Sequence, residues 1–210
     1  MKNYLLNFKL FYRLYQKIIR TKKSEYEFIR YIFQQSEKVN VLDLCCGDSF
    51  VLNFIDKNIQ DYIGIDNNEN YLKESRAKYE NYKFINSDIE NISQILELNN
   101  QDINFIFLNG AIHHLNDEII KNLIEILERK YPNAKFLSID PVRDQNKFLN
   151  KVMINFDRGK FIRNRDEYKI LMKNFSSLIT DDFFKMSFKL IFHFKNLDLE
   201  KTYLNWKKIN

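Results

Sequence analysis

The sequence predicts an α/β protein with a doubly wound, mostly parallel sheet that is covered by helices on both faces. Short apolar runs typical of strands alternate with helical stretches through the middle of the chain, and this order is typical of a parallel sheet. Several of these apolar runs end in an acidic or polar residue followed by a turn that opens a helix. In such sheets, ligands bind at the carboxyl ends of the strands.

Five apolar runs are expected to form the main strands. They are residues 39–44, 62–66, 82–85, 103–108 and 136–140. Helices are expected between them, near residues 50–58, 69–79 and 117–130. After Pro141 the pattern becomes more polar, and it predicts a helix near 166–173 and late strands at 183–194 and 202–207.

Two helices are expected before the sheet. Between residues 4 and 20, apolar side chains recur at helical spacing with basic residues between them. This basic amphipathic helix could pack on the core as a lid or lie on a membrane surface, and packing is the better supported of the two. A second helix is predicted to start at Ser24, because Ser24 and Glu27 have the spacing of a capping box.

Length and composition favour one globular domain. The chain has 210 residues, of which 45% are apolar and 29% charged, and this composition excludes a disordered protein. The net charge of +5 makes the surface mildly basic, which favours an acidic partner such as nucleic acid, a phosphate-bearing substrate or an anionic membrane.

The cysteines and the amino terminus favour a cytoplasmic protein without a metal centre. Cys45 and Cys46 are adjacent, and adjacent cysteines rarely form a disulfide. Two cysteines and three histidines do not suggest a structural zinc site. Lys2, Lys9 and Arg13 interrupt the amino-terminal apolar residues, so neither a signal peptide nor a membrane span is expected.

Four segments combine a strand-like run with a polar end. They are VLDLCCGDSF at 41–50, YIGIDNNENYL at 62–72, FINSDI at 84–89 and FIFLNGAIHHL at 105–115. A single acid at a strand end more often caps a helix or lies in a solvated turn than binds a ligand. Four such segments in order, with suitable spacing, indicate a ligand site.

These segments resemble the cofactor-binding motifs of class I S-adenosylmethionine-dependent methyltransferases. The resemblance implies a Rossmann-like sheet of seven strands with S-adenosylmethionine as the cofactor. Two later segments, SIDPVR at 138–143 and FDRGKFIRNRDEY at 156–168, resemble a bacterial subfamily that methylates small molecules, as do the leading helices. The similarity therefore covers nearly the whole chain.

By this resemblance, the turn after the first strand surrounds the methionine part of the cofactor, and Asp66 binds the ribose hydroxyls. Residues after the third strand contact the adenine, and residues after the fourth strand line the cofactor. The implied cofactor-binding residues are Asp43, Cys45, Gly47, Ser49, Asp66, Asn67, Ser87, Asp88, Ile89, Asn109 and Gly110.

The first motif departs from the family pattern. The usual D-x-G-x-G-x-G reads Asp43, Cys45, Gly47 and Ser49, so only the middle glycine is present. Cys and Ser are small enough for close approach, but a position that needs a positive φ would cost about 1 kcal/mol or more without glycine. A cofactor-binding scaffold without catalysis is therefore an alternative function.

The resemblance also implies a division of the single domain. Residues 1–38 form a helical cap, 39–140 the cofactor-binding core, 141–168 a segment that covers the substrate, and 169–210 the carboxyl-terminal helix and strands. In the core, His113 and His114 lie where the acceptor should approach. A hydroxyl acceptor needs a base, and we prefer His114 for that role. Alternatively, the pair packs the turn and caps the following helix.

Three arginines are candidates for binding the acceptor. Arg143, Arg158 and Arg163 suit a phosphate or carboxylate, because guanidinium binds such groups through two hydrogen bonds. Internal ion pairs with nearby acids are an equally good interpretation. Gly159 could supply a turn or the hinge of a lid.

The function predicted from the sequence is methyl transfer to a small-molecule acceptor, and the three arginines favour an acceptor with an anionic group. A hydroxyl of a sugar or of a surface-polysaccharide precursor is the expected site. A nucleic-acid methyltransferase is the other enzymatic alternative, favoured by the basic charge. It is disfavoured because residues 109–112 read N-G-A-I rather than the N-P-P-Y type of sequence that base-amino methylases present to a flipped base. The sequence does not indicate an oligomeric state.

Overall fold

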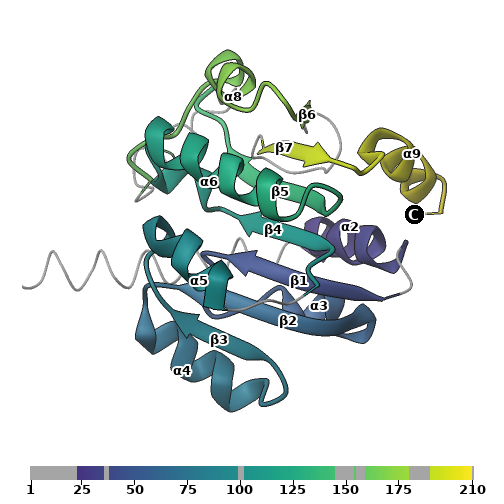
Figure 1. Ribbon diagram of the computed structural model, residues 1–210. Coiled ribbons are helices and arrows are strands. Elements are labelled where there is room, and N and C mark those ends of the chain that lie inside the picture. The colour runs from purple at the N-terminus through teal and green to yellow at the C-terminus, as the bar shows by residue number, and fades with distance from the viewer. Residues whose placement is uncertain are drawn as a thin grey trace, which may run out of the picture.

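The computed structural model describes residues 23–35, 38–98, 102–144, 154, 159–179 and 190–209. Within these ranges, seven strands form one sheet in the order β3-β2-β1-β4-β5-β7-β6 (Figure 1). The strands are β1 Val39–Leu44, β2 Ile59–Asp66, β3 Lys83–Asn86, β4 Phe105–Asn109, β5 Lys135–Pro141, β6 Ser176–Ile179 and β7 Leu190–Lys195. The first five are parallel, and β7 is antiparallel to β5 and β6. The predicted seven-stranded, doubly wound sheet is confirmed.

Helices cover both faces of this sheet, as Figure 1 shows. Their bounds are α2 Lys23–Gln34, α3 Leu52–Ile55, α4 Glu69–Lys78, α5 Ile92–Leu98, α6 Asp117–Lys130, α8 Arg165–Leu171 and α9 Leu199–Ile209, with 3-10 turns η1 Asp56–Asn58, η2 Ile89–Asn91 and η3 Ile112–His114. The apolar cores divide accordingly. Helices α2, α3 and α9 pack on one face, and α5, α6 and α8 pack on the other. Strands buried on both faces explain the continuous apolar runs in the sequence.

Asparagine caps set where two important helices begin. The side chain of Asn116 accepts a hydrogen bond from the backbone N–H of Ile119 at 2.9 Å, so α6 starts directly after η3. At α8, Asn164 and Glu167 form a reciprocal capping box. Each cap satisfies an N–H group that the helix itself leaves unpaired. The residues just before these two helices, which matter for the site, are thereby fixed.

The helices that flank the sheet differ in part from the prediction. Residues 202–207 are not a strand as predicted but part of α9, whose buried Leu199, Tyr203 and Trp206 recur at helical spacing. The strand prediction was wrong because aromatic and β-branched residues favour strands only when they do not follow a helical period. Ser24 lies inside α2 rather than before it, and its side chain is outside the described residues, as is the helix expected at 4–20.

The structure also contains elements that the sequence did not predict. Helix α5 and strand β6 are short, and the described part of the strand expected at 183–194 lies in β7. Residues 180–189 are not described. No helix among the described residues is long and apolar enough to cross a membrane. The division into cap, core, substrate segment and carboxyl-terminal part stays a prediction.

Candidate active site

A pocket lies where the order of the parallel strands reverses. Strand β1 has β2 on one side and β4 on the other, so the connections leaving β1 and β4 diverge at their carboxyl ends. Such a switch point is where doubly wound sheets bind ligands. The pocket here has a volume of about 150 Å³ and is lined by Tyr26, Asp43, Cys45, Cys46, Gly47, Asp48, Phe50, Val51, Phe107 and Asn109.

The turn after β1 has left-handed backbone at three alternate residues. The φ angles are 57° at Cys45, 57° at Gly47 and 52° at Ser49. These are the positions of the three glycines in the pattern considered above. Cys45 and Ser49 therefore keep the backbone shape of glycine, at a cost on the order of 1 kcal/mol or more each. The altered residues change the strain of this turn and not its path.

Asp66, at the end of β2, fixes this turn from the neighbouring strand. One carboxylate oxygen accepts the backbone N–H of Gly47 at 2.8 Å, and the other accepts that of Asn68 at 2.8 Å. A carboxylate oxygen can accept a second hydrogen bond, so Asp66 retains capacity for a ligand hydroxyl. The carboxylate thus shapes the turn and keeps hydrogen-bonding capacity beside it.

A buried acid lies at the floor of the pocket. Asp43 accepts a 2.5 Å hydrogen bond from the hydroxyl of Tyr62 on β2, and both side chains are buried. Burial raises the pKa of Asp43 to about 7; the Tyr62 hydrogen bond opposes this shift, and the charge of Asp66 adds to it. Asp43 therefore changes protonation state near neutral pH.

The two cysteines are half-buried thiols that stay protonated. Burial, together with the nearby carboxylates, raises the pKa of Cys45 to about 12 and that of Cys46 well above its usual value. Cys46 packs against Gly64 of β2, where an added Cβ atom would lie 2.9 Å from the Cys46 Sγ. Ser75 donates a 3.3 Å hydrogen bond to Ser49, which closes the turn from the side of α4.

The ends of β2 and β3 lie next to each other, because the two strands pair in parallel. Asn67 donates a 3.3 Å hydrogen bond to one oxygen of Asp88, and the other oxygen of Asp88 caps η2 by accepting the N–H of Glu90 at 3.1 Å. Ile89 is buried and Ser87 is partly exposed beside them. The carboxylate of Asp88, the amide of Asn67 and the apolar side chain of Ile89 therefore lie close together at the ends of β2 and β3, where they are available to bind a ligand.

The fourth motif carries the histidines. Asn109 lines the pocket, and Gly110 follows it with a φ of 66°. An added Cβ atom at Gly110 would lie 3.7 Å from the Cε1 atom of His113, so the His113 ring lies beside this glycine. His113 is buried, whereas His114 is exposed and its ring centroid lies 4.2 Å from that of His113.

Asp140 of β5 lies at the site, although the sequence motifs did not predict it as a site residue. One oxygen of Asp140 accepts the backbone N–H of His113 at 3.1 Å and lies 2.8 Å from Nδ1 of the His113 ring. Asp140 is fully buried, which raises its pKa, while the hydrogen bonds from His113 act in the opposite direction. The available signal was an acid at the end of a strand, immediately before Pro141.

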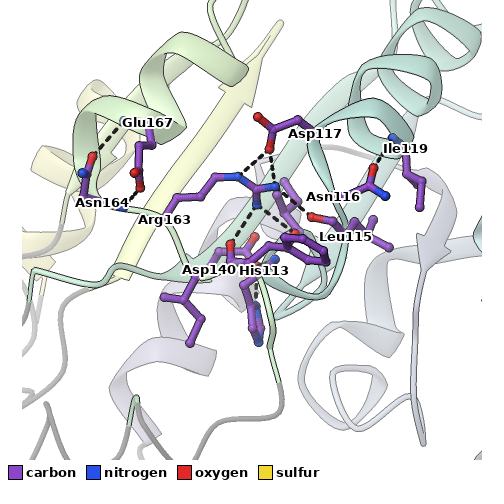
Figure 2. Close-up of polar contacts among 12 residues, drawn as sticks. His113, Leu115, Asn116, Asp117, Ile119, Asp140, Arg163, Asn164 and Glu167 are labelled. Carbon is purple, nitrogen blue, oxygen red and sulfur yellow. Dashed lines mark hydrogen bonds and ion pairs between the residues drawn. The ribbon is translucent and has the colours of Figure 1, made fainter.

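The structure places Arg163 in an internal network (Figure 2). Its guanidinium donates to Asp117 from Nε at 3.0 Å and from Nη2 at 2.6 Å. It also donates to three backbone carbonyls, those of Ile112, Leu115 and Phe161. With the side chain only 7% exposed, these contacts use the donors that would bind an acceptor. The sequence left an internal ion pair open but did not identify Asp117 as the partner.

The other two arginines differ from Arg163. Arg143 donates to the carbonyl of Ile162 from Nε at 3.0 Å and from Nη2 at 2.6 Å, but its side chain is 56% exposed. Arg158 lies outside the described residues. Among the described residues, no group of three or more His, Cys, Asp or Glu side chains could hold a metal ion.

Comparisons with known proteins bear on the domain and the fold. Residues 41–131 match a family model described as a methyltransferase domain. No curated protein matches the chain. Among solved structures, the plantazolicin methyltransferase BpumL has a TM-score of 0.62 at 16% identity, covering 90% of each chain. The methyltransferase domain of bacterial CtHen1 has a TM-score of 0.61 at 13% identity, covering 80% of this chain and 96% of that one.

A third solved structure, the YcgJ protein of Bacillus subtilis, has a TM-score of 0.54 at 15% identity, covering 71% of this chain and 68% of that one. At such identities, the solved structures establish the fold alone. The chain has the fold of class I methyltransferases, and its residues 41–131 match a methyltransferase domain, whose cofactor is S-adenosylmethionine. The residues at the switch point suit that cofactor: an added Cβ atom at Gly47 would meet nothing within 4 Å, so a ligand can approach the turn closely.

Proposed function

We propose that this methyltransferase acts on a hydroxyl group of a small-molecule acceptor, with a sugar or a surface-polysaccharide precursor as the acceptor class. The observation that carries the proposal is the pocket at the ends of β1 and β4 with a histidine pair on the adjoining turn. A hydroxyl is a weak nucleophile at neutral pH, so its methylation requires a base at this place.

The cofactor is held by the ends of the first four strands. The turn of Cys45, Gly47 and Ser49, with Asp43 below it, would hold the methionine part. Asp66 and Asn67 would hold the ribose, and Ser87, Asp88 and Ile89 would hold the adenine. Asn109 and Gly110 would complete the wall nearest the acceptor. Hydrogen bonds from a ribose diol to a carboxylate contribute roughly 1.5 to 3 kcal/mol of binding free energy.

When bound, the cofactor would supply an electrophilic methyl group on a positively charged sulfur, which is a good leaving group in a displacement by the acceptor oxygen. The protein contributes alignment, which is worth several kcal/mol in a displacement of this kind. It also contributes a base: the histidine pair receives the proton of the acceptor hydroxyl, which adds about 10²- to 10⁴-fold to the rate.

The BpumL structure and the arginines provide support for the class of acceptor. The BpumL structure contains a pentazolic desmethylPZN analogue and SAH, which supports a small-molecule acceptor beside a cofactor in this fold. Arg143 and Arg158 are the candidates for an anionic group on the acceptor, and Arg143 is partly exposed. The buried network of Arg163 favours a supporting role for that residue.

Two measurements test the proposal. Calorimetric titration with S-adenosylhomocysteine should show one site, and Asp66→Ala should weaken it about tenfold or more. The exposed Asp166→Asn on α8 is a control that should bind normally. A panel of sugars and nucleotide sugars is then incubated with methyl-labelled cofactor, and label should appear as a methyl ether. Tight binding without transfer to any hydroxyl would contradict the proposal and favour a scaffold.

A further inference from the structure

The buried Asp140–His113 pair points to a role for Asp140 that the cofactor motifs do not include. We propose that Asp140 is a positioning residue for His113, holding its ring so that Nδ1 carries the proton and Nε2 receives the proton of the acceptor. This inference rests on the proposed transfer to a hydroxyl. It identifies which histidine is the base and what orients it.

The contact geometry fixes the orientation of the imidazole. The same oxygen of Asp140 accepts the backbone N–H of His113 at 3.1 Å and its ring Nδ1 at 2.8 Å. Two donors from one residue on one oxygen restrict both the turn and the rotation of the ring. An ionised carboxylate can only accept hydrogen bonds, so the proton of the neutral ring must lie on Nδ1. The lone pair is then on Nε2, as a base requires.

The second carboxylate oxygen of Asp140 indicates that the Asp140–His113 pair has a role besides packing. It is buried and has no hydrogen-bond partner among the residues that the structure describes. An unsatisfied buried acceptor on a carboxylate is costly in a purely structural pair. Its negative charge becomes favourable when His113 takes up a proton and turns positive during the reaction. The carboxylate therefore stabilises the charged form of the base.

The location of His113 also favours it over His114. The His113 ring lies beside Gly110, which follows the pocket residue Asn109. The backbone carbonyl of His113 accepts the N–H of Phe161 at 3.0 Å, so the segment before α8 holds the turn in place. The His114 ring is exposed and lies tilted against the His113 ring, with an angle of 39° between the two planes. A base oriented by a buried carboxylate beside the pocket wall has the better geometry.

Several charged and titratable groups act on His113, and their signs give the expected response. Asp140 on β5 favours the protonated ring. Arg163, which donates to the carbonyl of Ile112 at 3.3 Å, opposes it, as does His114 when that ring is protonated. The Arg163 guanidinium carbon lies 5.8 Å from the ring centroid of Tyr168 on α8, and Tyr168 stays neutral because burial raises its pKa. Removing the charge of Asp140 should therefore lower the pKa of His113.

The decisive test reads the histidine rings directly and needs no acceptor. The chain has three histidines, so long-range ¹H–¹⁵N spectra can be assigned with single His→Gln variants. In the wild type, His113 should show a protonated Nδ1 and an unprotonated Nε2. In Asp140→Asn this tautomer preference should be lost, and the pKa of His113 should fall by about one unit or more. Asp166→Asn should change neither property.

An unchanged tautomer and pKa of His113 in folded Asp140→Asn would overturn the inference. Once the panel of sugars yields an acceptor, Asp140→Asn should lower kcat at least about tenfold and shift its pH profile, with the affinity for S-adenosylhomocysteine unchanged. A purely structural Asp140 would lower thermal stability without moving the pH profile, and this also overturns the inference. Failure of every acceptor with an intact histidine response would instead remove the proposed function.

Discussion

At the scale of single residues, the turn after β1 carries backbone strain at two positions. Cys45 and Ser49 have φ angles of 57° and 52°, which only glycine adopts without cost. Cys45→Gly is therefore expected to raise the free energy of unfolding by up to about 1 kcal/mol, because relief of strain outweighs the added freedom of the unfolded chain. The affinity for S-adenosylhomocysteine should stay the same or improve.

Denaturant unfolding and calorimetry measure both quantities for Cys45→Gly. Ser49→Gly is the matched comparison, and it should gain less because it loses the 3.3 Å hydrogen bond from Ser75. A clear loss of stability in Cys45→Gly would mean that the turn depends on the cysteine side chain more than on its backbone shape.

The buried Asp43 predicts a pH-dependent affinity for the cofactor. Its pKa is raised to about 7, so the side chain is neutral below that pH and negative above it. The ammonium of the cofactor's amino-acid part favours the ionised form, so affinity for S-adenosylhomocysteine should fall by up to about tenfold per pH unit below 7 and level off above it. Cys45, with a pKa of about 12, does not titrate in this range.

Calorimetric titration from pH 5.5 to 8.5 measures this dependence, and Asp43→Asn should make the curve nearly flat at the weaker end. A wild-type affinity that does not change with pH would show that the cofactor ammonium does not interact with Asp43.

At the scale of elements, Arg163 joins the turn after β4 to the start of α6 and to the segment before α8. Its guanidinium bonds Asp117 and the carbonyls of Ile112, Leu115 and Phe161. Arg163→Ala leaves buried carbonyls without donors, so it should lower the free energy of unfolding by about 2 to 4 kcal/mol. The Asp117 side chain is 61% exposed and regains water, which keeps the loss below that of a fully buried pair.

Thermal unfolding measures the effect of Arg163→Ala, with the exposed Arg165→Ala on α8 as the control that should change little. Affinity for S-adenosylhomocysteine should not change in either variant. An unchanged melting temperature together with a raised KM for the acceptor would return Arg163 to the role of an acceptor-binding residue.

His193 on β7 predicts a loss of stability in acid. The ring is fully buried, and burial lowers its pKa to about 3 from an ordinary value of 6.5. The unfolded chain binds a proton below pH 6.5 and the folded chain does not, so the stability due to neutral His193 is complete above 6.5 and decreases as the pH falls toward 3. Between pH 6.5 and 5 the loss is on the order of 2 kcal/mol.

His193→Gln removes this titration and keeps a polar group near Ser177, whose hydroxyl lies 2.9 Å from the ring Nδ1. The stability difference between wild type and His193→Gln should shrink as the pH falls from 6.5 to 5. Asp43 and Asp140 have raised pKa values and act in the opposite direction, but they are present in both proteins and cancel in the difference. A difference independent of pH would contradict the prediction.

Elements of strong local pattern were predictable, whereas short or mixed ones were not. The bounds of β1 and α6 agree with the predicted 39–44 and 117–130, because continuous burial and an amphipathic period leave clear signals. Helix α5 has seven residues and β6 has four, too few for a period to be recognised. Helix α9 contains strand-favouring residues, and its helical state depends on burying Tyr203 and Trp206 beside α2.

At the scale of the whole molecule, the sequence determined the doubly wound sheet and the order of the motifs. It also determined the turn after β1, in which Cys45 and Ser49 stand at two of the three glycine positions. These features depend on local sequence patterns, namely runs of apolar residues and acids at strand ends. The candidate cofactor residues follow from the same motifs, because parallel strands bring their carboxyl ends to one edge of the sheet.

The tertiary structure alone decided the partners of the buried polar groups. Asp43 with Tyr62, His113 with Asp140 and Arg163 with Asp117 join residues that lie 19, 27 and 46 positions apart. No local pattern encodes such pairs, because each depends on which strands become neighbours and on how the segment before α8 returns over η3. A buried charged group is stable only when it is paired, and the fold decides which partner is within reach. For this reason Arg163 pairs with Asp117, and Asp140 pairs with His113.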